Sequence, residues 1–161
     1  MIGTSDTLDA GALDVTEEQL WRATVRALLL MPTAVERDLR FASGLTLSMY
    51  AALLVLADAP GERMRMAQLA DAAGIARSRL SRVVDRLETT GSVHRVAYEG
   101  DLRVYEVVLT ERGRRRVITV QSRLAATVRS RLLAPVADAA LTPATFAGLM
   151  ARLAEASEPP R

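Results

Sequence analysis

Three residues, Gly74-Ile75-Ala76, link two short segments with helical spacing of apolar residues, and this link strongly limits how the chain can fold. A helix over residues 66–73 and another over residues 77–89 can pack at a steep angle only under two conditions. A small residue must lie where they cross, and a glycine must reverse the chain. Ala70 and Gly74 meet these conditions. The segment therefore predicts a helix-turn-helix.

The second helix of this motif divides into two faces when residues are placed at roughly 100° intervals around its axis. The inner arc is apolar and consists of Leu80, Val83, Val84 and Leu87. The opposite arc is polar and consists of Ser78, Arg79, Arg82, Asp85, Arg86 and Thr89. Ala76 stands where a capping Ser or Thr is usual, so the helix is capped by Ser78 or by no side chain.

A small β-hairpin is expected directly after Gly91. Residues 92–97 and 103–109 are rich in β-branched side chains and flank a loop over residues 98–102. We expect these strands to form the wing of a winged helix-turn-helix, so the fold class is mainly α with a small β wing.

Helices are predicted on both sides of this lobe. A long first helix spans residues 16–40, with Thr16 as its N-cap and a kink or break at Pro32. Thr46 caps the next helix, which ends at the turn Ala59-Pro60-Gly61. After the hairpin, Thr110 caps a long helix that ends at Pro135, and a last helix starts at Thr142-Pro143.

Length and composition exclude several classes of protein. The 161 residues suit one domain, and neither a signal peptide nor a long apolar run is present, so a cytoplasmic protein without membrane contact is expected. Cysteine is absent and His94 is the only histidine, which excludes thiol chemistry and a multi-histidine zinc site within one chain. We therefore expect no enzyme, no catalytic residues, no metal and no cofactor. Aromatic residues make up 4% of the chain, which disfavours an RNA-stacking surface.

The distribution of charge favours double-stranded DNA as the partner. All 21 basic residues are arginines, and residues 62–116 hold twelve of them against eight acids. Arg77, Arg79 and then Arg82 are best placed for forked hydrogen bonds to guanine, whereas Arg86 is expected to grip phosphate. The alternative is a solvated helix face on which these arginines pair with Asp85 and Glu88.

Two longer runs resemble the MarR (multiple antibiotic resistance regulator) family. The first, residues 82–95, reads RVVDRLETTGSVHR and is similar to the family's recognition helix and its exit into the wing. The second, residues 101–114, reads DLRVYEVVLTERGR and carries Asp101 and Arg103 in the family's Asp-x-Arg wing pattern. One departure is Tyr98, where relatives usually have a second Asp.

The resemblance implies a homodimeric transcriptional regulator, a repressor by family default, that binds a pseudo-palindromic operator. The helix over residues 77–89, the fourth along the chain, would enter the major groove. Arg103, oriented by Asp101, would enter the minor groove. For these two residues an ordinary surface ion pair is the alternative. A winged-helix protein-interaction module without specific DNA binding is the alternative for the whole chain.

The resemblance also assigns parts of the chain. It implies a single domain over residues 16–157. The tail before it, residues 1–15, is expected to be disordered because it is rich in Gly, Thr, Ser and Asp with few large apolar groups. Within that domain, residues 45–110 bind DNA, and residues 16–41 and 111–156 form the dimer, although these helices could instead pack on one another within one chain.

Relatives bind small aromatic or phenolic anions between the dimer helices and the DNA-binding lobe. Here Trp21, Arg22, Val25 and Tyr50 could line such a cleft, with an apolar wall, one cation and one hydroxyl. The alternative is that Trp21 and Tyr50 are packing residues.

Overall fold

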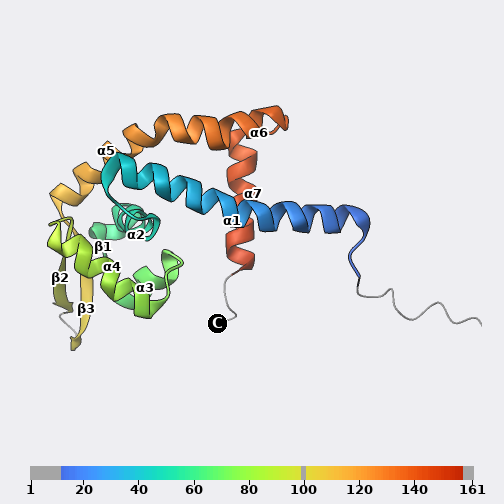
Figure 1. Ribbon diagram of the computed structural model, residues 1–161. Coiled ribbons are helices and arrows are strands. Elements are labelled where there is room, and N and C mark those ends of the chain that lie inside the picture. Colours follow the sequence, from blue (N-terminus) through green and yellow to red (C-terminus); the bar gives the residue numbers. More distant parts are fainter. Residues whose placement is uncertain (1–11, 99–100, 158–161) are drawn as a thin grey trace, which may run out of the picture.

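The computed structural model of the chain describes residues 12–98 and 101–157, and residues 101–103 by their backbone alone. Figure 1 shows a mainly helical chain with a small sheet at one end, as the sequence predicts. The elements are α1 (Val15–Ser43), α2 (Leu47–Asp58), η1 (Pro60–Glu62), β1 (Arg63–Arg65), α3 (Met66–Ala72), α4 (Arg77–Thr89), β2 (Val93–Tyr98), β3 (Asp101–Leu109), α5 (Glu111–Val128), η2 (Arg129–Leu133), α6 (Ala134–Asp138) and α7 (Pro143–Ala156).

Helix α1 differs from the sequence-based expectation at two points. Its N-cap is Asp14, not Thr16, because the Asp14 carboxylate accepts from the Glu17 backbone N–H and Glu17 bonds back to Asp14 in a capping box. The expected break at Pro32 is wrong, since α1 runs unbroken to Ser43. Pro32 is exposed, so water can solvate the carbonyl that lacks its usual amide partner.

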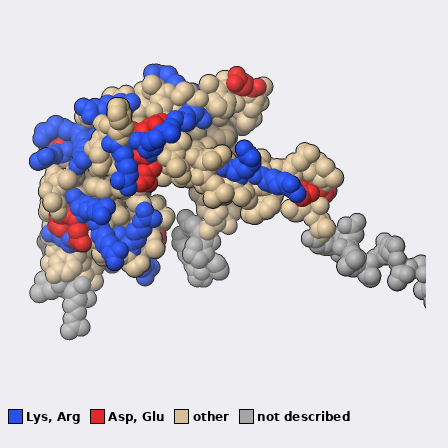
Figure 2. Space-filling model, viewed as in Figure 1, with Lys and Arg blue, Asp and Glu red and all other residues tan. Residues whose placement is uncertain are grey.

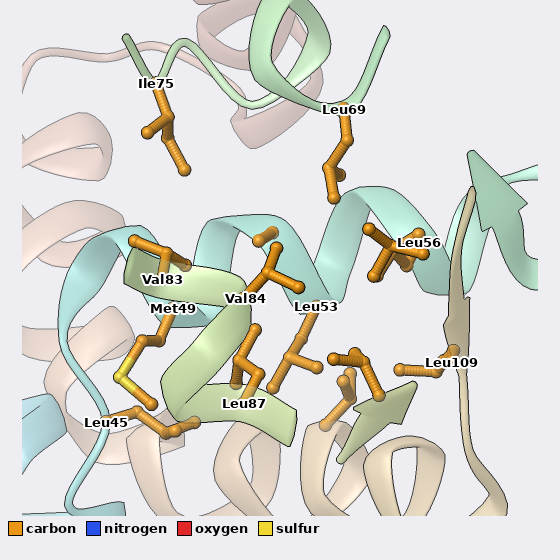
Figure 3. Packing of buried hydrophobic residues seen from close by; sticks show 14 of the residues in the cluster. Leu45, Met49, Leu53, Leu56, Leu69, Ile75, Val83, Val84, Leu87 and Leu109 are labelled. Carbon is orange, nitrogen blue, oxygen red and sulfur yellow. The ribbon is translucent and has the colours of Figure 1, made fainter. Parts of the chain in front are cut away.

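The hydrophobic core lies among α2, α3, α4 and the sheet, and buried residues of α1 and α5 extend it. Figure 3 shows Leu53 and Leu56 of α2 facing Val84 and Leu87 of α4, and all four side chains are fully buried. The turn between α3 and α4 contributes the buried Ile75. This packing fixes how α4 is rotated about its own axis.

The sheet has three antiparallel strands in the order β1-β3-β2. Strands β2 and β3 form the predicted hairpin, with Val93 opposite Leu109 and a bulge between Ala97 and Tyr98. The sequence did not indicate β1, a three-residue strand that pairs Arg63 with Val108 of β3. The strand, Arg-Met-Arg, has no β-branched residue, and three residues are too few for their alternation to reveal it.

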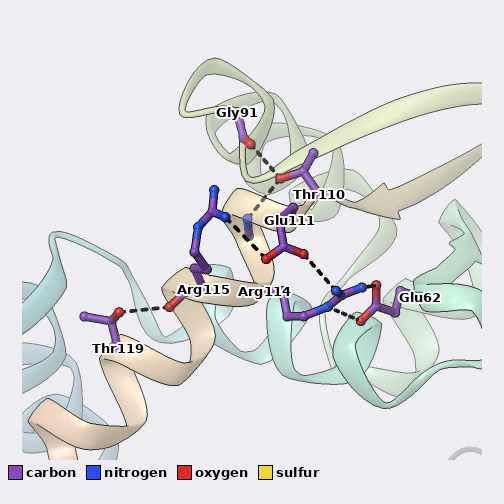
Figure 4. Close-up of polar contacts among 8 residues, drawn as sticks. Glu62, Gly91, Thr110, Glu111, Arg114, Arg115 and Thr119 are labelled. Carbon is purple, nitrogen blue, oxygen red and sulfur yellow. Dashed lines mark hydrogen bonds and ion pairs between the residues drawn. The ribbon is translucent and has the colours of Figure 1, made fainter.

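The start of α5 packs closely against the end of α4. Thr110 caps α5 by accepting from the Gly113 N–H at 2.9 Å, and its hydroxyl also lies 2.8 Å from the carbonyl oxygen of Gly91. Figure 4 shows this junction, with Arg114 bridging Glu111 and Glu62. The contact requires glycine at position 113, because a Cβ there would lie 2.1 Å from the Ser92 carbonyl oxygen.

Two arginines of α5 join it to the C-terminal end of α1. Arg123 donates to the Ala42 carbonyl at 2.6 Å, and Arg116 donates to the Ser43 carbonyl at 3.2 Å. Cations stabilise this end of a helix because its last carbonyls lack amide partners. Arg116 also donates to Ser92, which is fully buried, and burial lowers the pKa of Arg116.

Helix α5 does not end at Pro135, so that prediction is wrong. The helical path continues through a π-helical turn, η2, into α6, where Pro135 lies in the first turn and Asp138 is the last residue. A proline is compatible with the first turn of a helix because no amide donor is needed there. Helix α7 starts at Pro143, in agreement with the prediction, and Thr142 is its N-cap.

The N-terminal half of α1 and all of α7 project from the lobe (Figures 1 and 2). None of the residues of α7 is buried within the described chain. Among the described residues, no single helix has both the length and the apolar composition to cross a membrane. Two pairs of successive helices have this length and composition only when each pair is taken together, and the two helices of a pair are bent by 76° in one case and 101° in the other.

We predict that Gly113→Ala destabilises the protein by about 3 kcal/mol, since the added methyl group must displace backbone atoms at the junction of α4 and α5. The melting temperature, followed by circular dichroism at fixed protein concentration, should fall by about 6–12 °C. Gly148→Ala is the matched control, because nothing lies within 4 Å of the Cβ it would add to helix α7. Equal melting of Gly113→Ala and wild type would contradict this account of the junction.

Candidate nucleic-acid interface

The two predicted faces of α4 are present in the structure. Leu80, Val83, Val84 and Leu87 are buried, with at most 6% of each side chain exposed. The polar arc is exposed along its length and consists of Ser78, Arg79, Arg82, Asp85, Arg86 and Thr89. The chain therefore presents the polar arc to solvent because the opposite arc is held in the core.

The first turn of α4 has no side-chain cap. Ala76 occupies the N-cap position, and its carbonyl accepts from the amides of Arg79 and Leu80. Of the two possibilities left by the sequence, the helix adopts the one without a capping side chain. The positive end of the helix dipole is thus left at the solvent-facing end that carries Arg77 and Ser78.

Among the described residues, the ion pairs around α4 leave three of its arginines without a protein partner. Arg77 lies 3.3 Å from Asp71, and both side chains are mostly exposed. In the part of the chain that the structure describes, Arg79, Arg82 and Arg86 form no hydrogen bond or ion pair through their side chains. The alternative reading, in which these arginines pair with Asp85 and Glu88, is therefore not what the structure contains.

Asp85 and Glu88 are instead bound by Arg95 of strand β2. The Arg95 guanidinium donates to Asp85 at 2.6 Å and pairs with the Glu88 carboxylate, and the Arg95 backbone N–H donates to Glu88 at 2.8 Å. Partial burial works to lower the pKa of Arg95, but the two carboxylates outweigh it and the pKa is raised. One cation from the wing side thus pairs with both acids of α4.

Figure 2 shows arginine side chains gathered over α3 and α4, with acidic side chains at one edge of the group. Arg77, Arg79, Arg82 and Arg86 contribute to this region, and all four are exposed. An exposed, positively charged face on a helix of 13 residues suits a negatively charged groove.

The wing lies beside α4, and the loop end of its strand β2 makes an aromatic contact with β1. The Arg65 guanidinium stacks over the ring of Tyr98 at 4.1 Å from the centroid, a cation–π contact between the ends of β1 and β2. The backbone of Asp101 and Arg103 belongs to β3, with Asp101 opposite Tyr98. The side chains of both residues lie outside the described residues.

The four residues expected to line a ligand cleft do not share one cavity within the chain. Trp21, Arg22 and Val25 line a surface hollow of about 380 Å³ on α1, where Arg22 pairs with Glu18. Tyr50 lines a separate cavity of about 470 Å³ between α1, α2 and α5, and burial raises the pKa of its hydroxyl. The wall of this second cavity is largely apolar, with Leu54 and Val128 among its residues.

Within residues 12–98 and 101–157, no group of three or more His, Cys, Asp or Glu side chains could hold a metal ion. His94 is exposed on β2.

Sequence reasoning missed Arg95, although a signal was present. Strand alternation places Arg95 on the same side of β2 as the buried Val93, while His94 and Val96 face solvent. A charged residue on the inner side of a strand requires a partner of opposite charge, and the helix that precedes the strand offers Asp85 and Glu88, ten and seven residues before Arg95.

The comparisons with known proteins agree with this geometry. The sequence profile of the MarR family matches residues 43–103. The structure is similar to Sco3205, a MarR family transcriptional regulator from Streptomyces coelicolor crystallised in complex with DNA. Sequence identity is 31%, the match covers 92% of this chain and 95% of that one, and the TM-score is 0.79.

Two further regulators of Streptomyces coelicolor are similar over most of their length. AbsC, a MarR family transcriptional regulator, shares 33% identity over 89% of this chain and 93% of its own, with a TM-score of 0.73. PcaV, a transcriptional regulator crystallised with its natural ligand, shares 26% identity over 92% of this chain and 99% of its own, with a TM-score of 0.64. A comparison with curated protein sequences gives no match.

We predict that substitutions on the two faces of α4 affect stability to very different extents. Val84→Asp places a carboxylate in the core without a partner and should lower the free energy of unfolding by about 4 kcal/mol. Arg82→Ala, at an exposed position, should change it by less than about 0.5 kcal/mol. Urea unfolding followed by circular dichroism measures both, and similar midpoints for the two variants would show that the inner face is wrongly assigned.

Proposed function

The chain belongs to the MarR family of transcriptional regulators, and from this premise we propose that it binds double-stranded DNA sequence-specifically, with α4 in the major groove. The observation that carries the proposal is the exposed arc of α4, where Arg79, Arg82 and Arg86 have no protein partner among the described residues. Guanidinium groups in this position can form forked hydrogen bonds to guanine or pair with phosphates.

The roles of the arginines follow from their places on α4. Arg79, at the N-terminal end with Ser78, and Arg82, one turn later, are proposed to contact base edges, and Arg86 to contact phosphate. Arg77 is proposed to join them by exchanging its exposed ion pair with Asp71 for DNA, because such pairs contribute little in water. The crystallisation of Sco3205 in complex with DNA supports DNA as the partner.

The wing is proposed to contact the adjacent minor groove. Arg103 would enter the groove, where a narrow A·T-rich segment concentrates negative potential, and Asp101 would orient it. The Arg65–Tyr98 contact supports this proposal because it ties the loop end of β2, opposite Asp101, to β1.

We further propose that two copies of the chain form a homodimer through α1, α5 and α7. The support is apolar surface that the single chain leaves uncovered, including Leu28 at 66% exposure, Leu29 at 67% and Leu153 at 50%. A two-fold dimer would present two copies of α4 about 34 Å apart, the repeat of the DNA helix, so its operator would be a pseudo-palindrome. Such a protein acts where the chromosome lies, in the cytoplasm, and repression is the role proposed.

A small aromatic or phenolic effector is proposed to release the DNA. The 470 Å³ cavity beside Tyr50 supports an effector site, since its size and apolar wall suit a drug-sized molecule. The ligand complex of PcaV supports the same view. In the proposed dimer, Trp21, Arg22 and Val25 could approach this cavity only from the partner subunit.

The other candidate function is a protein-interaction module that does not bind specific DNA. Salt separates the two, because each phosphate contact releases counterions and makes the affinity for DNA fall steeply as salt rises.

We predict that the protein shifts a duplex from the region upstream of its own gene. Arg79→Ala and Arg82→Ala should each weaken binding by roughly 1–3 kcal/mol, because each removes a base contact. Arg103→Ala should lower the affinity mainly for sites with A·T-rich flanks. Mobility-shift titrations at several salt concentrations, repeated with a panel of phenolic acids, measure binding, specificity and release together.

Arg152→Ala is the control, since it removes an exposed charge on α7, remote from α4. Equal affinities for wild type and the three DNA-face variants would remove the proposed mechanism. An unchanged shift with every phenolic acid would remove the effector class.

The dimer is tested on α7, whose Phe146, Leu149, Met150 and Leu153 form one apolar face. We predict that Leu149→Asp with Leu153→Asp converts a dimer of wild type into a monomer in sedimentation velocity, because the charges would be buried at the interface. Glu155→Arg, on the opposite face, should remain dimeric. A wild-type monomer at micromolar concentration would refute the proposed assembly.

A further inference from the structure

Arg95 occupies an unusual place between the wing and the recognition surface. Its side chain is only 24% exposed and crosses from β2 to α4, where it meets Asp85, Glu88 and the Ser81 carbonyl at 3.3 Å. Asp85 itself remains 61% exposed on the face that carries the unpaired arginines. A single cation therefore lies against both acids of the helix.

Without that cation, the charges of α4 would oppose DNA binding in two ways. Asp85 and Glu88 are three residues apart on one helix, so their negative charges would reinforce each other near the DNA phosphates. Arg82 precedes Asp85 by three residues, a spacing at which opposite charges on a helix pair. In the structure Asp85 is bonded to Arg95 instead.

Building on the proposed function, we propose that Arg95 is a positioning residue for DNA recognition that holds Asp85 and Glu88 away from Arg82 and from the DNA backbone. Arg95 itself need not touch DNA. Its forked guanidinium can serve both carboxylates at once, which the point charge of a lysine does less well.

The test separates this electrostatic role from a structural one. Fluorescence anisotropy measures the affinity of four proteins for the upstream duplex: wild type, Arg95→Ala, Asp85→Asn with Glu88→Gln, and the triple variant. We expect Arg95→Ala to lose about tenfold in affinity and to show a shallower salt dependence, because two carboxylates become free and Arg82 is diverted. The triple variant should regain affinity to within about threefold of wild type, because no carboxylate remains to be neutralised.

A triple variant as weak as Arg95→Ala would overturn the proposal, since the ion pairs would then matter only for fixing the wing. Wild-type affinity for Arg95→Ala would overturn it as well. Failure of wild type to bind the duplex would instead overturn the proposed function, so the two failures are distinguishable.

Thermal melting checks that each variant is folded at the assay temperature. If Arg95→Ala is unfolded at that temperature, Arg95→Lys replaces it in the experiment. We expect Arg95→Lys to lose a few-fold in affinity and to recover it when Asp85→Asn is added, and no recovery would overturn the proposal.

Discussion

The packing of α4 against α2 is the constraint on which the rest of the structure depends. Val84 and Leu87 are fully buried, and withdrawing one such side chain from the core costs roughly 1.5–3 kcal/mol. Any rotation of α4 about its axis would expose several of them together. The direction in which Arg79 and Arg82 point is therefore set by the core, and these arginines need no partner of their own to hold the helix in place.

Polar contacts fix the positions of the neighbouring elements relative to α4. Arg95 fixes the wing to α4, and the junction of Thr110, Gly113 and Ser92 fixes the start of α5 to the end of α4. Arg116 then links the same junction to the end of α1. Two of the helices proposed to form the dimer, α1 and α5, are thus bonded directly to the lobe proposed to read DNA. An effector bound beside Tyr50, between α1, α2 and α5, would have a continuous path of contacts to α4.

Local patterns were enough to predict most of the fold. The turn at Gly74, the apolar arc of α4, the hairpin, the caps Thr46 and Thr110 and the start of α7 each depend on a few neighbouring residues, and all are present. The exposed arc of the candidate interface was predicted for the same reason. Features that depend on distant contacts were not: β1 exists only because β3 pairs with it, and Arg95 binds acids seven and ten residues away. At Pro32 and Pro135 helical context outweighed the local tendency of proline to break a helix.

The central claim is that the arginine-bearing arc of α4 enters the major groove of DNA. The most direct test is dimethyl sulfate protection of guanine N7, an atom of the major groove, on the bound upstream duplex. The account predicts two protected guanine clusters on one face of the duplex, about 10 base pairs apart or a multiple of that distance. A bound complex in which every guanine N7 stays fully reactive would contradict it.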